Sequence, residues 1–429
     1  MFSDLVTRRL SPRCILYAFI MAVAAITALS APHAWAAAKF KTLYSFCTKS
    51  ECVDGQQPEA PLLIEVDGNV VGSTNQGGTS GDGTIFELSG GDRTLHTLYT
   101  FCGYDCNGPS TPVGNLVVDT NGALYGVTNT GSDAYAGGVI FKLSPNADRT
   151  KWKLRILYTF CSTDCSDGGN PVAGLTYAGA ADGTPYDGRS PLFGTTYDGG
   201  NINYSGGAIY QFTPSSRGGK LKVLYSFCSQ SACNDGATPN GRLIVDGAGN
   251  IYGAAQSGGS QNGGALFELR QKGHQYEESV LYNFDGTQHP YGTLIMDSTG
   301  QIYGTAADSD GGFVYKLVPD GGNSQETTLY HFCTESDCAD GAYAWGGVVM
   351  DADGVLYGST FIGGSANEGA VFKLKGSKET VLHSFCSSGC ADGANPAEGL
   401  IIDGSGKLIG TTENNGANPN GGTIFRLSR

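Results

Sequence analysis

The sequence predicts an all-β protein, a seven-bladed β-propeller made of four-stranded blades. One unit of three short β segments recurs seven times along the chain, and a fourth segment, Leu-Tyr-x-Phe, joins each copy to the next. Glycine accounts for 66 of 429 residues, well above its usual share of about 7%. Seven such units of about 50–65 residues are typical of a propeller. A β-solenoid is the alternative, but its coils are shorter and it needs capping repeats.

The clearest copy runs from Gly399 to Leu427, near the end of the chain. It contains the segments LIID and KLIGTT, a tight Asp-Gly-Ser-Gly turn between them, and a Gly/Asn-rich loop that leads into GTIFRL. Apolar and β-branched residues fill each segment, and turn formers separate the segments, which indicates strands.

Two features of the repeat predict how the blades pack and close. The middle segment of every copy carries a glycine, which implies close approach of another backbone or a ring: Gly72, Gly126, Gly194, Gly253, Gly304, Gly358 and Gly410. The chain begins with the fourth segment type and ends with the third. We therefore expect the N-terminal strand Thr42–Phe46 to complete the last blade beside Gly422–Leu427 and so to close the ring.

Residues 1–36 have the features of a secretory signal peptide. Arg8, Arg9 and Arg13 precede an apolar run, and Ala34-Trp35-Ala36 supplies small residues at the expected cleavage spacing. An uncleaved membrane anchor is the alternative, although the apolar run is short for one. We expect a single propeller domain over residues 37–429, secreted or periplasmic, with an association with the bacterial envelope left open and no transmembrane segment in the mature chain.

The charge of the chain limits its partners. The net charge is −14 at pH 7, and residues 1–36 carry three Arg and one Asp, so their removal makes the chain more negative. Such a balance argues against nucleic acid or anionic lipid as a partner. We expect a monomer whose partner is a glycan, a peptide or a protein.

Twelve of the 13 cysteines form six local pairs. The pairs are Cys47/Cys52, Cys102/Cys106, Cys161/Cys165, Cys228/Cys233, Cys333/Cys338 and Cys386/Cys390. In an exported protein such pairs predict disulfides. A zinc site is the alternative, but it needs two pairs brought together, and pairs on separate blades lie too far apart. Each disulfide closes a very small loop, so its expected role is to stiffen that loop.

The repeat pattern P-x-x-G-L-x-x-D, G-x-L-Y-G-T-T, G-G…G-T-x-F-x-L and L-Y-S-F resembles the bacterial GloVer tandem repeat. That repeat occurs in secreted proteins called choice-of-anchor tandem repeat proteins, and the resemblance covers nearly all of residues 41–427. It implies an exported repeat protein and no particular reaction. Members often carry a C-terminal anchoring tail, whereas this sequence ends at Ser428-Arg429, so we do not expect anchoring through such a tail.

The Gly-rich loops and the Cys-containing loops are predicted to share one face of the propeller, and most acidic residues fall in them. In six copies an aspartate there precedes a glycine: Asp54, Asp167, Asp235, Asp285, Asp340 and Asp392. We interpret these aspartates as turn formers. A ring of calcium-binding carboxylates is the alternative, but the sequence has no D-x-D-x-D-G loop, so no cofactor is expected and Ca²⁺ stays an open alternative.

The candidate site lies where the repeat is broken, just after a proline that recurs in most copies. The residues that differ there between copies, with one aromatic neighbour, are Glu59, Asn115, Asn240, Arg242, Tyr291, Tyr343, Trp345 and Glu398. Aromatic, amide and charged groups that converge on a concave channel mouth predict a ligand site. Irregular packing around a water-filled channel would explain the same residues without a ligand.

An enzyme is the second functional hypothesis. A calcium-dependent propeller hydrolase or lactonase would place Glu59, Asn115, Asn240 and Glu398 on a metal at the channel mouth. The sequence has no G-x-S-x-G, H-E-x-x-H, P-loop or C-x-x-C-H motif, so we expect no catalytic residues. A purely structural or envelope-associated protein is a third hypothesis.

Overall fold

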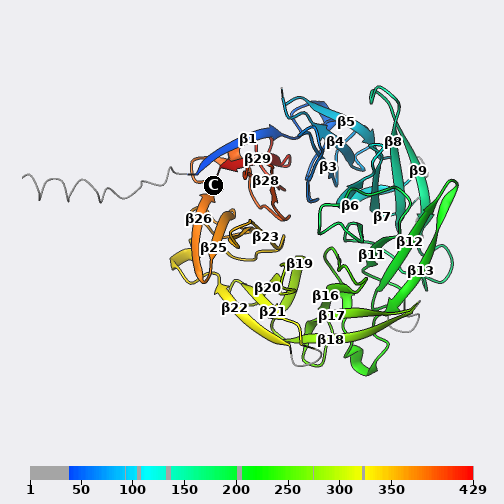
Figure 1. Ribbon diagram of the computed structural model, residues 1–429. Helices are drawn as coiled ribbons and strands as arrows, with labels where there is room; N and C mark the ends of the chain where they lie inside the picture. The colour runs from blue at the N-terminus through cyan, green and yellow to red at the C-terminus, as the bar shows by residue number, and fades with distance from the viewer. Residues whose placement is uncertain are drawn as a thin grey trace, which may run out of the picture. The chain divides into compact units, whose positions relative to one another are not determined.

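The computed structural model describes residues 38–428 except 92, 104–107, 132–136, 201–204, 274 and 321–323. The predicted signal peptide lies outside the described residues. Lys39–Arg429 forms one compact unit, in which seven antiparallel sheets stand around a ring (Figure 1). Within the described ranges there is no α-helix, and therefore no helix that could span a membrane. The structure confirms the predicted seven-bladed propeller.

The blades follow one another in chain order, each with its first strand innermost (Figure 1). Blade 1 consists of β2(Leu63–Ile64), β3(Val70–Thr74), β4(Thr84–Leu88) and β5(Leu95–Thr100). Blade 2 consists of β6(Ser110–Val118), β7(Leu124–Thr130), β8(Val139–Pro145) and β9(Trp152–Thr159). Blade 3 consists of β10(Thr176–Tyr177), β11(Leu192–Thr196), β12(Ala208–Ser215) and β13(Gly218–Ser226). Blade 4 consists of β14(Ala237–Pro239), β15(Ile244–Val245), β16(Ile251–Ser257), β17(Asn262–Lys272) and β18(Gln275–Asp285).

The remaining blades complete the circle. Blade 5 consists of β19(His289–Met296), β20(Ile302–Ala307), β21(Phe313–Val318) and β22(Gln325–His331). Blade 6 consists of β23(Val348–Met350), β24(Leu356–Thr360), β25(Ala370–Lys375) and β26(Lys378–Ser384). Blade 7 consists of β27(Ile401–Ile402), β28(Leu408–Thr412), β29(Thr423–Ser428) and, from the other end of the chain, β1(Lys39–Ser45).

The innermost strands are irregular, which separates them from the regular outer three. In blade 4 the strand is split, because β14 and β15 both pair with β16. In β6 the register shifts between Val113 and Val117, and in β19 it shifts between Tyr291 and Ile295. The chain leaves the ladder at these points, directly after the recurring proline, so this short segment faces the channel instead of the sheet.

The N-terminal strand closes the ring, as predicted. Strand β1 pairs antiparallel with β29, in a register that runs from Lys39 opposite Ser428 to Ser45 opposite Thr423. Figure 1 shows β1 as the outermost strand of the blade that also contains the C-terminus. Backbone hydrogen bonds extend the junction, since Phe46 N–H donates to the Gly422 carbonyl at 3.0 Å.

Neighbouring blades are joined by one repeated aromatic contact. The Phe that ends each Leu-Tyr-x-Phe segment is fully buried and meets the aromatic ring on the third strand of the next blade. Ring centroids lie 4.9–5.5 Å apart in these pairs, which is the usual range for edge-on aromatic packing. The seven pairs are Phe46–Phe86, Phe101–Phe141, Phe160–Tyr210, Phe227–Phe267, Phe284–Tyr315, Phe332–Phe372 and Phe385–Phe425.

The glycine in every middle strand lies against that same third-strand ring. A Cβ at Gly72 would collide with the ring of Phe86, and a Cβ at Gly126 would collide with the ring of Phe141. The other five glycines face a Phe or Tyr in the same way. The prediction of a close approach is therefore confirmed, and the approaching group is a ring of the neighbouring strand.

Five of the six predicted disulfides are present in the structure. They are Cys47–Cys52, Cys161–Cys165, Cys228–Cys233, Cys333–Cys338 and Cys386–Cys390. The sixth predicted pair joins Cys102 to Cys106, and Cys106 lies outside the described residues. Each bond stays within one loop, so the alternative of a zinc site shared between two pairs is wrong for these ten cysteines.

The second cysteine of each pair lies in backbone that the sequence did not predict. A plain loop was expected, but Cys52, Cys233 and Cys338 end the single 3₁₀ turns η1(Ser50–Cys52), η3(Ser231–Cys233) and η4(Ser336–Cys338). Cys390 begins the turn η5(Cys390–Asp392), whereas Cys165 lies in a bend. In Cys52, Cys165, Cys233 and Cys338 the φ angle is positive, at 50–56°, which is uncommon for a residue with a side chain. Cys390 forms its bond without a positive φ, so these short disulfides are compatible with more than one backbone turn.

The cysteine loops are built around a buried carboxylate. Asp54, Asp235 and Asp340 are completely buried. In the loop of Asp235, the Tyr225 hydroxyl donates to its Oδ2 at 2.7 Å and the Ser229 N–H donates at 2.9 Å. The interior of each such loop is therefore polar and filled by its own hydrogen bonds.

The oxygens of these buried aspartates accept hydrogen bonds from their own loop, in keeping with their interpretation as turn formers, and the calcium alternative stays a hypothesis. The same arrangement joins Tyr44 to Asp54, Tyr158 to Asp167 and Tyr330 to Asp340, and His383 takes the tyrosine's place beside Asp392. Some of the carboxylates expected on the surface of the face with the cysteine loops are thus buried inside those loops.

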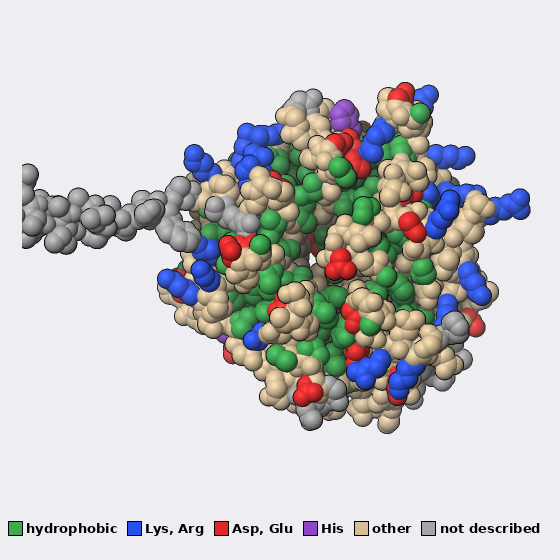
Figure 2. Space-filling model, viewed as in Figure 1, with side chains coloured by type: hydrophobic (Ala, Val, Ile, Leu, Met, Phe, Trp, Pro, Cys, Tyr) green, Lys and Arg blue, Asp and Glu red, His purple; other side chains and the backbone are tan. Residues whose placement is uncertain are grey.

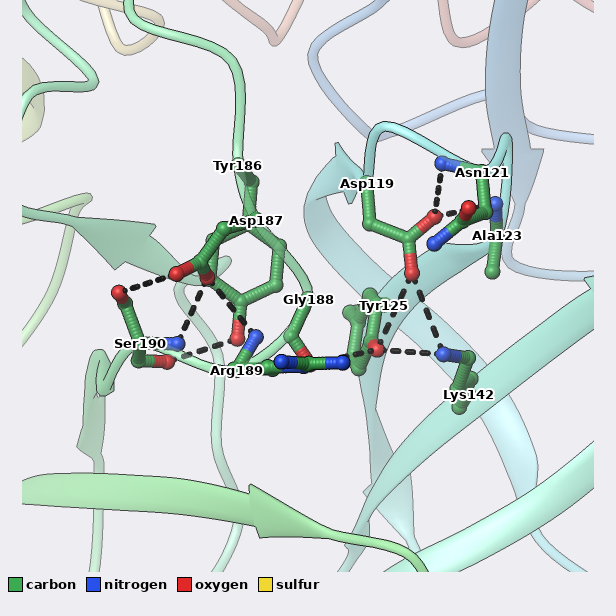
Figure 3. A network of polar contacts seen from close by, with 10 residues as sticks. All are labelled: Asp119, Asn121, Ala123, Tyr125, Lys142, Tyr186, Asp187, Gly188, Arg189 and Ser190. Atoms are coloured by element: carbon green, nitrogen blue, oxygen red, sulfur yellow. Dashed lines mark hydrogen bonds and ion pairs between the residues drawn. The ribbon is translucent and has the colours of Figure 1, made fainter.

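The turns between the first and second strands are held by a second set of aspartates (Figure 3). Asp119 Oδ1 accepts hydrogen bonds from the N–H groups of Asn121 and Ala123 at 2.9 and 3.0 Å. Its Oδ2 lies 3.2 Å from Lys142 Nζ and 3.3 Å from the Tyr125 hydroxyl. Comparable turns are built on Asp246, Asp297, Asp351 and Asp403, as the turn prediction requires. Glu65 differs, because it forms an ion pair with Arg149 at 2.8 Å.

Removal of residues 39–46 should open the ring. Strand β29 would lose its partner and expose an unpaired edge, and loss of the buried Phe46 ring alone should cost about 3 kcal/mol of unfolding free energy or more. We expect a lower melting temperature and self-association, measured by calorimetry and light scattering. A synthetic peptide of residues 39–46 added in trans should restore both properties. A shortened protein that stays monomeric with unchanged melting would contradict this closure.

Candidate functional site

A cavity of about 350 Å³ lies at the channel mouth, on the side where the innermost strands begin. Its lining includes seven of the eight sequence-predicted ligand-site residues: Glu59, Asn115, Asn240, Arg242, Tyr291, Trp345 and Glu398. They come from six of the seven blades, so the structure brings together residues up to 339 positions apart. That they bind a ligand stays a prediction.

The predicted disulfide residues are separate from this cavity. None of the described cysteines is among the residues that line it, including the second members of the pairs, Cys52, Cys165, Cys233, Cys338 and Cys390. These five side chains are half-buried in their own loops. The disulfides therefore belong to the frame of the propeller and not to the candidate ligand site.

Aromatic side chains form one side of the mouth. Trp345 stacks on Phe361, with ring centroids 4.2 Å apart and an interplanar angle of 25°. Tyr291 of blade 5 also lies near Trp345, with ring centroids 6.0 Å apart and an interplanar angle of 31°. Tyr343, the eighth predicted residue, does not line the cavity but lies 6.1 Å from Trp345. Tyr343 thus belongs to the support of Trp345.

Three glutamates gather at the junction of blades 7 and 1. Burial, together with the charge of Glu413 and a hydrogen bond between the two side chains, raises the pKa of Glu59 to about 7. Burial also raises the pKa of Glu398 well above its usual value, and the charges of Glu59 and Glu413 add to the effect. The amide nitrogen of Asn75 donates a hydrogen bond to Glu59. Glu59 is therefore increasingly protonated as the pH falls below 7, and Glu398 favours its neutral form more than an exposed glutamate does.

Asn75, Phe361 and Glu413 were missed by the sequence reasoning, although a signal for them exists. They occupy one position of the repeat, directly after the threonine that ends the second strand. In the other copies this position holds Asn129, Tyr197, Gln256 and Ala307. The test that found the other residues, a search for positions that differ between copies, would have found these three as well.

Asn115 and Arg242, the polar residues of the remaining cavity walls, differ in whether their polar groups already have hydrogen-bond partners in the protein. The Asn115 amide is buried and its nitrogen donates to the Leu175 carbonyl at 3.0 Å, so that nitrogen links blades 2 and 3. Arg242 lines the cavity from blade 4. Burial lowers the pKa of its guanidinium and the nearby Tyr177 opposes that shift, but an arginine stays charged at any physiological pH.

A second cavity of about 280 Å³ continues the channel below the first. The two share Pro61, Asn115, Arg242, Thr293 and Gly346 in their linings. Most other residues of the second cavity are aliphatic, including Leu116, Leu243, Leu294, Val348 and Leu400. The polar groups of the channel are therefore concentrated at its mouth.

The described residues contain no group of three or more His, Cys, Asp or Glu side chains that could hold a metal ion. Glu59 and Glu398 lie in the same cavity, yet the neighbouring Glu413 shares a hydrogen bond with Glu59 instead of a common metal position. The proposed calcium set of Glu59, Asn115, Asn240 and Glu398 thus remains a hypothesis.

The fold and this mouth define a propeller with a cavity on its axis, lined by the residues in which its repeats differ. The chain belongs to the Gloeobacter/Verrucomicrobia repeat family, which it matches over residues 33–191, 184–339 and 306–429. This confirms the resemblance noted in the sequence. No curated protein sequence matches the chain.

Solved structures with the same architecture are distant in sequence. An oligogalacturonate lyase from Vibrio parahaemolyticus is 11% identical, with a TM-score of 0.51 over 91% of this chain and 97% of that one. A protein from Lactobacillus plantarum is 15% identical, with a TM-score of 0.51 over 84% and 99%. A candidate 6-phosphogluconolactonase from Bacteroides uniformis is 14% identical, with a TM-score of 0.47 over 80% and 88%. At these identities the likeness concerns the fold alone.

The raised pKa of Glu59 makes stability depend on pH. A glutamate whose pKa is higher in the folded than in the unfolded protein stabilises the fold below about pH 4.5, and this contribution is lost as the pH rises through 7. The wild type should therefore lose unfolding free energy between pH 5 and pH 8. Glu59→Gln should reduce that loss by about 2 kcal/mol, measured by chemical denaturation at both pH values. The exposed Glu51→Gln variant is the control, and an equal slope in both variants would contradict the assignment.

Proposed function

We propose that this protein is a ligand-binding module that acts outside the cytoplasm and takes a glycan or a peptide into the cavity at its channel mouth. One observation carries this proposal. The side chains that break the repeat, scattered over six blades, line a single cavity, whereas the repeated side chains pack inside and between blades. A cavity lined by residues freed from packing is what a binding site needs.

The chemistry of the mouth suits a polar ligand with a flat or weakly polar face. Trp345 and Tyr291 offer aromatic surface to such a face. Glu59, Glu398 and Asn240 offer hydrogen-bonding groups from neighbouring and opposite blades. Groups that differ in kind and approach from several directions favour one orientation of a ligand.

The disulfides support a location outside the cytoplasm. Bonds of this kind form and persist in oxidising compartments, and five are present among the described residues.

Blade 5, which lacks a cysteine pair, carries only a short loop at Asp285–Pro290 beside Tyr291. That shortened loop leaves the aromatic side of the mouth less covered than the others.

The hydrolase or lactonase alternative has a direct test. It requires a divalent ion bound at the mouth, so elemental analysis of the purified protein should find about one equivalent of Ca²⁺ that is lost in Glu398→Gln. In the binding-module proposal, ligand binding persists after exhaustive treatment with a chelator.

Trp345→Ala should weaken ligand binding by about 2 kcal/mol, because a central aromatic anchor of a binding site is lost. Binding would be measured by calorimetry with a ligand selected from glycan and peptide arrays. Trp152→Ala is the matched control, since it removes the same side chain from the outer strand β9. If Tyr291→Ala combined with Trp345→Ala leaves affinity unchanged, the site lies elsewhere on the propeller.

A further inference from the structure

Arg242 is the only cation among the described residues that line the mouth cavity. It forms no ion pair with any described carboxylate, although other arginines of the chain do. The side chain is largely enclosed by protein, and Tyr177 is the titratable neighbour that affects its pKa. An enclosed guanidinium without a partner is costly unless an anion pairs with it.

The acids of the cavity lie on the far side from Arg242. Arg242 belongs to blade 4, whereas Glu59 and Glu398 belong to blades 1 and 7, and these blades face blade 4 across the ring (Figure 1). Figure 2 shows one face of the ring, where mainly hydrophobic side chains and a few acidic ones surround the central opening. Tyr291 and Trp345 of blades 5 and 6 occupy the wall between them. The mouth therefore has a cationic side, an aromatic side and a side of carboxylic acids.

We propose that the ligand is an acidic saccharide whose uronic-acid carboxylate pairs with Arg242, an inference that rests on the ligand-binding function proposed above. A guanidinium binds a carboxylate through two parallel hydrogen bonds. The apolar face of the sugar ring lies against Trp345 or Tyr291. Its hydroxyl groups reach Glu59, Glu398 and Asn240, which can donate or accept hydrogen bonds.

A peptide fits the same mouth less well. Extended peptides commonly bind by adding a strand to an open sheet edge, and the innermost strands leave no such edge. Their backbones approach one another so closely that a Cβ at Gly241 would collide with the Gly292 carbonyl, and a Cβ at Gly292 would collide with the Trp345 carbonyl. Both glycines have positive φ, 104° and 69°. A saccharide uses side chains alone and needs no free edge.

The acids opposite Arg242 add a pH dependence to this recognition. The pKa of Glu59 is raised to about 7 and that of Glu398 lies well above its usual value, so the protonated forms can bind hydroxyl groups without repelling the anion at Arg242. As the pH rises through 7, Glu59 gains negative charge in the cavity that also contains Arg242. An acidic saccharide should thus bind more tightly at pH 5.5 than at pH 8, and a neutral one should show a smaller change.

The test compares ligands that differ only in charge. Oligosaccharides of galacturonic, glucuronic and mannuronic acid would be titrated beside their methyl esters and the corresponding neutral hexose oligomers, by calorimetry. At least one free acid should bind roughly tenfold tighter than its ester, as for a charged hydrogen-bonded pair. Arg242→Met should abolish the difference between acid and ester, because the free acid loses more affinity than the ester. Arg155→Met, on the outer strand β9, is the matched control and should keep it.

Each other outcome decides against the inference. A preference for the acid that survives in Arg242→Met overturns it, as does equal binding of acid and ester by the wild type. If only neutral glycans or peptides bind, and Trp345→Ala weakens them, the inference fails and the proposed function stands. If nothing in the saccharide and peptide panels binds, both fail. Should Arg242→Met not fold, Arg242→Lys replaces it, with a reduced preference expected and an unchanged preference overturning the inference.

Discussion

The structure depends on the contact between a buried phenylalanine of one blade and the ring on the third strand of the next. This contact occurs at all seven junctions, with centroids 4.9–5.5 Å apart, and each third-strand ring is in turn covered by a glycine of the second strand. Without a side chain on that glycine, ring and backbone meet directly. The packing of one blade on the next therefore depends on two aromatic rings and on the glycine that gives one of these rings room.

Because the junctions are made by the outer strands, the innermost strands are free to vary. Their regular part is only two residues long in β2, β10 and β27, and the segments before it differ from blade to blade. Some side chains there contact the neighbouring blade, as Asn115 and Glu59 do, but they take no part in the repeated aromatic contact. A repeat protein thus acquires a site without disturbing the repeat that folds it.

Most of the fold could be predicted from the sequence, because the same pattern of strands and turns can be recognised in seven copies of the repeat. The glycine in each middle strand and the unmatched strand at each end were enough to predict ring packing and ring closure. The candidate site was predicted less completely. Residues that break the repeat, including Glu413 and Phe361, could be found by comparing copies, but their proximity to Glu59 and Trp345 could not, because it arises only in the folded protein.

The burial of charged side chains and the resulting pKa shifts could not be predicted from the sequence. The aspartates of the cysteine loops look like surface charge in the sequence, whereas Asp54, Asp235 and Asp340 are buried under tyrosine hydroxyl groups. The raised pKa of Glu59 arises from burial and from another acid that approaches from the last blade. Burial and approach both require the closed ring.

The pairing of β1 with β29 has a consequence for the order of folding. Strand β1 pairs with β29, and Lys39 and Ser428 are 389 positions apart in the chain, so β1 is synthesised long before its partner. Contacts so remote in the chain form slowly. The disulfides, by contrast, join cysteines four or five residues apart, so in an oxidising compartment each can form without a distant part of the chain. The disulfides can thus form loop by loop, whereas the ring of blades closes only when β1 pairs with β29.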